Sequence, residues 1–153
     1  MAGAILSIGE ALKVWVQVPG YPGWDVLVQY LTPAKVKLLS EDATTKKLNR
    51  QTRQMEDKVD NEILAKLMTK AMILDWRGLT TAMLRDLVPV PDAVNAKLEK
   101  EHGGKLPFSP EDLEVLVENT YSRSFMDTVM ECATDLHTMR EMEKRALEKN
   151  SGA

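Results

Sequence analysis

The chain has 153 residues, of which 44% are apolar and 28% charged, with a formal net charge of −3. This length fits one domain, residues 1–153, and the mild negative charge excludes a strong general attraction to nucleic acid or anionic lipid. The longest apolar run, Ala71 to Leu74, is far shorter than the roughly 20 residues of a transmembrane helix. The N-terminus lacks the cationic start of a secretory signal, and the single cysteine excludes an internal disulfide, so we expect a cytoplasmic protein.

Residues 12–31 predict a β-hairpin. Apolar and other side chains alternate with a period of two on both sides of a proline- and glycine-rich loop, residues 19–24. The inward-facing positions are Leu12, Val14, Val16, Val18, Val26, Val28 and Tyr30. Because an isolated two-stranded ribbon is marginally stable in water, we expect this hairpin to pack on helices.

The next stretch predicts two helices separated by a polar loop. Thr32 is a good N-cap for a short helix that runs to about Ala43. Residues 44–58 lose the apolar pattern and predict a loop or a frayed, exposed helix. Asp60 is expected to cap the central helix, which carries a wide apolar stripe and runs to about Leu74.

A proline- and glycine-rich segment, residues 88–110, divides the later helices. Before it, Thr80 or Thr81 can cap a short helix that ends at Leu87. Within it, Asp92 is expected to cap a weak helix from residue 93 to 101, which Gly103 and Gly104 end.

Two helices complete the prediction. Ser109 and Pro110 begin one that stops near Asn119. The last is expected to start at Ser122 or Ser124 and reach Lys149, with a narrow apolar seam of Phe125, Val129, Cys132, Leu136 and Met139. The fold class predicted is α+β, mainly α. An N-terminal β-hairpin packs on a bundle of about five helices (33–149), ending in a long C-terminal helix and a disordered tail, residues 150–153.

The sequence carries little catalytic or metal-binding chemistry. Only His102, Cys132 and His137 are soft metal ligands, and a zinc site needs three or four that converge. Cys132 lies on the apolar seam, where a thiol is normally inert packing. Neither a nucleophile elbow nor a phosphate-binding glycine loop occurs. We therefore expect no enzyme, no metal and no cofactor, and we expect function through protein binding.

Three sets of residues are candidates for partner binding. Arg50 and Arg53 lie in a basic stretch that is a solvated loop, a contact for an acidic protein or, less readily, a nucleic-acid site. Trp76 followed by Arg77 either anchors a loop against the core or belongs to an interface. The last helix carries four methionines that are either core filler or an adaptable binding face: Met126, Met130, Met139 and Met142.

The order of several short motifs resembles a known family. They are Tyr30-Leu31-Thr32-Pro33, the basic residues 50–54, Asp75-Trp76-Arg77-Gly78-Leu79, and Leu106-Pro107-Phe108-Ser109-Pro110-Glu111-Asp112-Leu113. In this order the chain resembles the tail assembly chaperones of long-tailed bacteriophages and their prophages, which are encoded just before the tape-measure protein. The segment from Val88 to Gly104 departs from that pattern, being longer and richer in proline.

The resemblance implies a chaperone that coats the tape-measure protein, keeps it soluble and helps recruit tail-tube protein. It also implies a place in the host cytoplasm and absence from the finished virion. It implies no active site, and the oligomeric state stays open. Two rival functions remain. One is a virion structural protein of the tail or head–tail connector, and the other is a small DNA-binding regulator supported only by the basic stretch.

Overall fold

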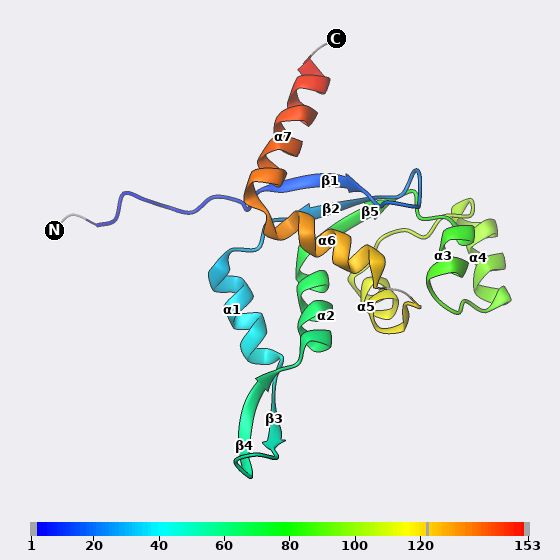
Figure 1. Cartoon of the computed structure of the whole chain (residues 1–153). Helices are drawn as coiled ribbons and strands as arrows, with labels where there is room; N and C mark the ends of the chain where they lie inside the picture. The colour runs from blue at the N-terminus through cyan, green and yellow to red at the C-terminus, as the bar shows by residue number, and fades with distance from the viewer. Residues whose placement is uncertain (1–2, 122, 152–153) are drawn as a thin grey trace.

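The computed structural model describes residues 3–121 and 123–151 (Figure 1). In chain order the elements are β1 (Lys13–Gln17), β2 (Asp25–Gln29), α1 (Pro33–Asp42), β3 (Thr44–Asn49), β4 (Gln54–Val59), α2 (Asn61–Met72), β5 (Ile73–Arg77), α3 (Thr81–Leu87), α4 (Asp92–His102), α5 (Pro110–Asn119), α6 (Ser124–Thr134) and α7 (Leu136–Ser151). The predicted class, α+β and mainly helical, is confirmed. The helices number seven within the described residues, rather than about five.

The predicted N-terminal hairpin is confirmed, and a third strand joins it. β1 and β2 pair antiparallel with Val14 opposite Val28 and Val16 opposite Val26. The sheet order is β1-β2-β5. The prediction that the central helix continues to Leu74 is wrong, because α2 ends at Met72 and Ile73 takes extended backbone. From there the chain gains hydrogen bonds along the edge of β2, and it buries Ile73 and Trp76 against the core.

Helices cover one face of this sheet. α2 packs against α1, α5 and α6, as expected of a central helix, and α6 also contacts β2 (Figure 1). Trp24 is fully buried and lies 5.7 Å from the Phe125 ring of α6, centroid to centroid. Lys66 of α2 reaches Glu118 of α5 at 3.0 Å, so an ion pair joins these two helices at the surface.

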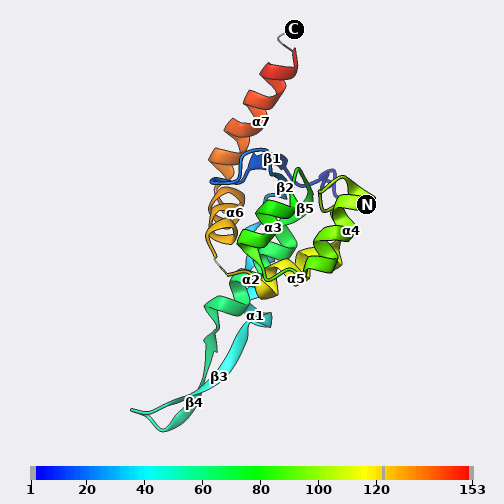
Figure 2. The same ribbon diagram turned by 90° about the vertical axis from the view of Figure 1, so that its right-hand side faces the viewer.

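A second hairpin, β3–β4, stands where a polar loop was predicted, and that prediction is wrong. Its strands pair without interruption from Thr44 opposite Val59 to Asn49 opposite Gln54. The Asn49 side chain closes the turn by accepting from the N–H groups of Gln51 and Thr52. The hairpin projects from the body, as Figures 1 and 2 show, and every residue of β4 is exposed.

The predicted last helix is broken in two at Asp135. This residue takes extended backbone and caps α7, since its carboxylate accepts from the N–H of Thr138 at 3.1 Å and from its hydroxyl at 2.8 Å. These hydrogen bonds lower the pKa of Asp135. α7 extends through Ser151 into the segment predicted as a tail, while residues 152 and 153 and the alternative start at Ser122 lie outside the described residues.

Local capping signals place the remaining helices. Thr80 caps α3 and Ser109 caps α5 through their side-chain oxygens, as predicted. Asp92 does not cap α4, because Pro91 occupies the cap position without a side-chain hydrogen bond and Asp92 is already helical. α4 ends at His102, and Gly103 caps it with a left-handed φ of 62°. None of the described helices is long and apolar enough to cross a membrane.

Candidate protein-binding site

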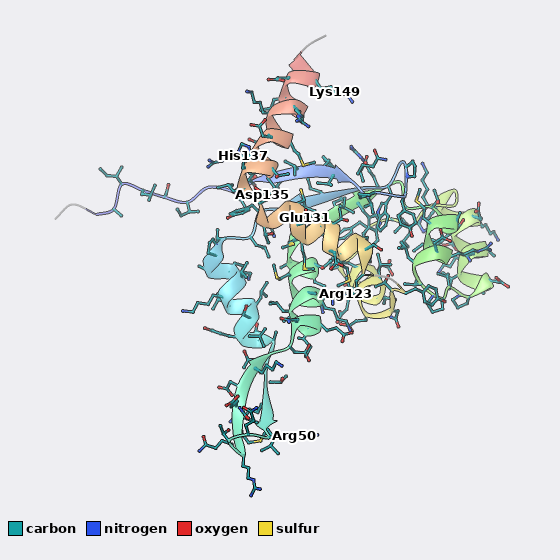
Figure 3. The ribbon with its side chains drawn as sticks, in the orientation of Figure 1. Arg50, Arg123, Glu131, Asp135, His137 and Lys149 are labelled. Atoms are coloured by element: carbon teal, nitrogen blue, oxygen red, sulfur yellow. The ribbon has the colours of Figure 1, made fainter. Side chains whose placement is uncertain are left out.

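The structure does not bring the predicted binding residues together. Arg50 lies at the far end of the β3–β4 hairpin (Figure 3), and Arg53 lies in the same turn with a φ of 56°. Trp76 and Arg77 lie on β5, in the three-stranded sheet. The four methionines lie on α6 and α7. These residues therefore belong to three separate regions.

Trp76 and Arg77 point to opposite faces of β5. Trp76 is buried, its indole N–H donates to the Leu106 carbonyl at 2.9 Å, and its ring meets Phe108 edge to face at 4.9 Å. It therefore anchors the loop after α4 against the core, which is one of the two interpretations the sequence left open. Trp76 is not accessible to a partner of the folded chain.

Arg77 lies on the sheet face opposite the buried one. Its guanidinium lies 4.1 Å from the centre of the Trp15 ring, and its Nε donates to Asp25 at 3.1 Å. Trp15 and Arg77 are exposed, and Asp25 is partly exposed. These contacts hold Arg77 in one orientation but leave it accessible.

An accessible methionine face on the last helix is not present in this fold. Met126 and Met139 are in the core, because α6 packs on α2 and the start of α7 packs on β1. Met130 and Met142 are half-buried beside that core. Met142 Sδ lies 3.6 Å from Cys132 Sγ, and burial raises the pKa of the Cys132 thiol. Cys132 is thus a packed thiol with little thiolate character.

A groove that the sequence did not predict lies between α3, α4 and α5. Its first hollow has a volume of about 350 Å³. Its walls are almost entirely aliphatic and are formed by Leu84, Val88, Pro89, Val90, Pro91, Val94, Leu98, Leu106, Val115 and Leu116, with Asp112 and Asn119 as the polar lining. A second hollow of about 370 Å³ shares Val94, Leu98, Leu106 and Asp112 and continues to Pro107 and Phe108, with Lys97, His102 and Ser109 as further polar lining. We call the two together the apolar groove.

The Val-Pro-Val-Pro segment explains how the groove forms. Pro89 and Pro91 exclude helix from this stretch and favour extended backbone before them, so residues 88–91 separate α3 from α4. Val88 is buried and Val90 half-buried, which supplies an aliphatic wall between the two helices. The sequence predicts that these prolines interrupt helical structure. Their role in shaping a hollow depends on where α5 packs.

The groove is open to solvent and its rim is apolar. Val94 and Val115 remain 44% and 57% exposed, although both line the first hollow. The sequence held a weak signal for these residues. Val94 and Leu98 are four apart on one helix face, and Val115 lies off the buried stripe of Leu113, Leu116 and Val117. Concave, mostly aliphatic surfaces of this size accept apolar side chains of a ligand.

The groove offers shape and apolar surface rather than reactive groups. Its ionisable lining residues are Asp112, which lines both hollows, and Lys97 and His102, which line the second hollow. Among the described residues, no three His, Cys, Asp or Glu side chains converge in a way that could hold a metal ion. The arrangement is suited to reversible binding of a peptide or helix.

Comparison with known proteins identifies one family. The family model described as YdaY prophage protein matches residues 35–150, which include the β3–β4 hairpin and every residue of the apolar groove. No curated protein and no solved structure matches the chain.

Proposed function

The chain belongs to the YdaY prophage protein family, and we propose that it acts as a phage tail assembly chaperone that binds the tape-measure protein in the host cytoplasm. In this role it keeps the tape-measure protein soluble and helps recruit tail-tube protein, and it acts without catalysis. The observation that carries the proposal is the apolar groove, which is open along a rim of exposed valines. A protein that holds another chain needs such a surface.

The chemistry of the groove fits a helical client. Long, coiled-coil-prone proteins present aliphatic side chains at positions three and four apart along one face. Two adjoining hollows, which share Val94, Leu98, Leu106 and Asp112 in their lining, can take two such side chains from one client helix. Because the first hollow is almost entirely aliphatic, binding there should select for an apolar stripe rather than for one sequence, while Lys97, His102 and Ser109 of the second hollow can meet polar groups beside that stripe.

The β3–β4 hairpin supplies a second proposed contact. Along its strands lysines lie opposite acids, with Lys46 opposite Asp57, so much of its charge is balanced across the ladder. At the turn, Arg50 and Arg53 are exposed and no acid lies in residues 49–54. We propose that this tip binds an acidic segment of a protein partner, because the projecting hairpin holds the tip away from the body.

Co-expression with the tape-measure protein of the same prophage tests the proposal. The variant Val94→Glu/Val115→Glu places two charges on the groove rim at positions that are already exposed, so the fold should persist. We expect the soluble fraction of the tape-measure protein to fall at least severalfold with this variant. Leu38→Glu on α1 is the matched control, because Leu38 is 56% exposed and lies outside the groove. Equal solubilisation by the rim variant and the wild-type chain contradicts the proposal.

Two rival functions are separated by independent measurements. A structural protein of the tail or head–tail connector would persist in purified particles at a fixed stoichiometry, which quantitative mass spectrometry detects. A chaperone, as proposed here, should be absent from purified particles. A DNA-binding regulator would shift a duplex at physiological salt through Arg50 and Arg53, and the balanced charge along the hairpin disfavours such binding.

A further inference from the structure

The N-terminal arm, which we define as residues 3–11, is the most exposed apolar segment of the described chain. It runs away from the body without regular secondary structure (Figure 1). Ile5, Leu6 and Ile8 are 101%, 81% and 88% exposed, so these side chains meet water almost as they would in an unfolded chain. The hydrogen bonding of the hairpin reaches back only to Leu12, whose carbonyl accepts the Tyr30 N–H.

Three aliphatic side chains within four positions are a concentrated apolar surface. Single exposed aliphatic residues are common on proteins, whereas contiguous ones usually mark a site of association. In extended backbone Leu6 and Ile8 lie on one side of the arm, and Ile5 and Ser7 lie on the other. The arm therefore presents a pair of aliphatic side chains, roughly 7 Å apart, on the same side.

The same molecule carries a surface that matches this pair. The apolar groove consists of two adjoining hollows of about 350 and 370 Å³. The first is lined almost entirely by aliphatic side chains, and the second combines Val94, Leu98, Leu106, Pro107 and Phe108 with the polar side chains of Lys97, His102, Ser109 and Asp112. Figure 1 shows the arm and the α3–α4 end of the chain on opposite sides of the body. An arm that points away from its own groove is placed to meet the groove of another copy.

We propose that the N-terminal arm of one copy binds in the apolar groove of a second copy, with Leu6 entering one hollow and Ile8 the other. Arm and groove are different surfaces, so the contact is head-to-tail, and an assembly that has not closed into a ring keeps one free arm and one free groove. The chain thereby links into open or ring-shaped assemblies. A second consequence rests on the proposed function. If the groove binds the tape-measure protein, the arm competes with this client and covers the groove until the client displaces it.

Light scattering of the purified full-length chain over a range of concentrations tests the self-association. We expect the mean mass of the wild-type chain to rise with concentration. The arm variant Leu6→Asp/Ile8→Asp and the groove variant Val94→Glu/Val115→Glu should each remain monomeric. Ser7→Asp is the matched control, since it adds a charge to the opposite side of the arm and should associate as the wild type does.

Mixing the two defective variants gives the sharpest test. The groove variant retains an intact arm and the arm variant an intact groove, so one of each should form a dimer of twice the monomer mass and nothing larger. A labelled peptide of residues 3–11 should bind the arm variant and fail to bind the groove variant. A wild-type chain that stays monomeric at all concentrations overturns the inference, and so does a mixture that stays monomeric or an arm variant that associates normally.

The tape-measure solubility assay separates this inference from the proposed function. An arm variant that is monomeric yet still holds the client supports both. A groove variant that loses the client while the wild-type chain is monomeric supports the function and rejects the arm contact. A groove variant that becomes monomeric yet still holds the client supports the arm contact and rejects the groove as the client site.

Discussion

The two hairpins of this protein have the same antiparallel pairing in opposite surroundings. In β1–β2 every second residue is buried, as with Val14 and Val16, because helices cover one face and β5 extends the sheet. In β3–β4 the cross-strand pair Leu48 and Met55 is exposed, and no third strand joins the ladder among the described residues. The two hairpins therefore differ in how they pack against the rest of the molecule and not in how their strands pair.

This difference separates the sources of stability. A two-stranded ribbon gains little on its own in water, so β1–β2 depends on the core that it helps to build. β3–β4 depends on its own turn and on cross-strand contacts, which contribute small increments. A hairpin held only by local contacts leaves its side chains accessible, which suits the contact with a partner proposed for its tip.

The largest contrast is expected between Trp24→Ala and Leu48→Ala. Trp24 lies immediately before β2, is fully buried and packs against Tyr21 and Phe125, so its truncation should lower the free energy of unfolding by about 3–5 kcal/mol. Leu48 is exposed on β3, and its truncation should change this free energy by less than about 0.5 kcal/mol. Urea denaturation followed by circular dichroism measures both. Similar losses for the two variants would mean that the hairpins share one core.

The next largest loss of stability is expected at the turn of the β1–β2 hairpin, against which Gly78 lies. Gly78 has a φ of 76°, and an added Cβ would collide with the Gly23 carbonyl oxygen. Gly20 has a φ of 86° and open space around an added Cβ. Gly20→Ala should therefore cost only the left-handed strain of roughly 1–2 kcal/mol, and Gly78→Ala should cost clearly more. Equal costs in thermal denaturation would show that the turn moves away from β5 without penalty.

Alternating apolar residues made β1–β2 predictable from the sequence. The same reasoning missed β3–β4, because no residue of β4 is buried and the period-2 signal reports burial rather than strand formation. β5 was missed for a different reason. Its residues continue the apolar stripe of α2, and only the free edge of β2, a tertiary feature, converts them to a strand. Caps were predictable at Thr32, Asp60 and Ser109 because their partners lie within three residues.

The candidate site was the least predictable part. The sequence directed attention to residues that favour interfaces, yet Trp76, Met126 and Met139 belong to the core. The apolar groove needs residues from three helices that are adjacent only after folding, and aliphatic residues carry no chemical signature. Arg50 and Arg53 were correctly seen as an exposed basic group, but the hairpin that carries them outward was not.

The turn of the exposed hairpin predicts a smaller effect of opposite sign. Arg53 has a φ of 56°, which glycine adopts without strain, so Arg53→Gly should stabilise β3–β4 by less than about 1 kcal/mol. Amide hydrogen exchange in β3 and β4 should slow accordingly. Arg50→Gly is the control, because it removes the same charge at a residue whose φ is not positive. Faster exchange in the Arg53 variant would show that its side chain, rather than its backbone, determines the turn.

The smallest effect is expected from removing β3–β4 altogether. The Ala43 carbonyl accepts the Asp60 N–H at 2.9 Å, so the two ends of the hairpin are already adjacent. Replacing residues 45–58 with a short glycine linker retains this bond, the buried Ala43 and the Asp60 cap of α2. Because the removed residues contact little besides each other, the free energy of unfolding of the body should change by less than about 0.5 kcal/mol. Thermal denaturation and binding of the client, both measured on this variant, then separate a role of the hairpin in stability from a role in partner binding. An unchanged melting temperature with weaker binding assigns the hairpin to the partner, whereas a large loss of stability would make it part of the same cooperative unit as β1–β2.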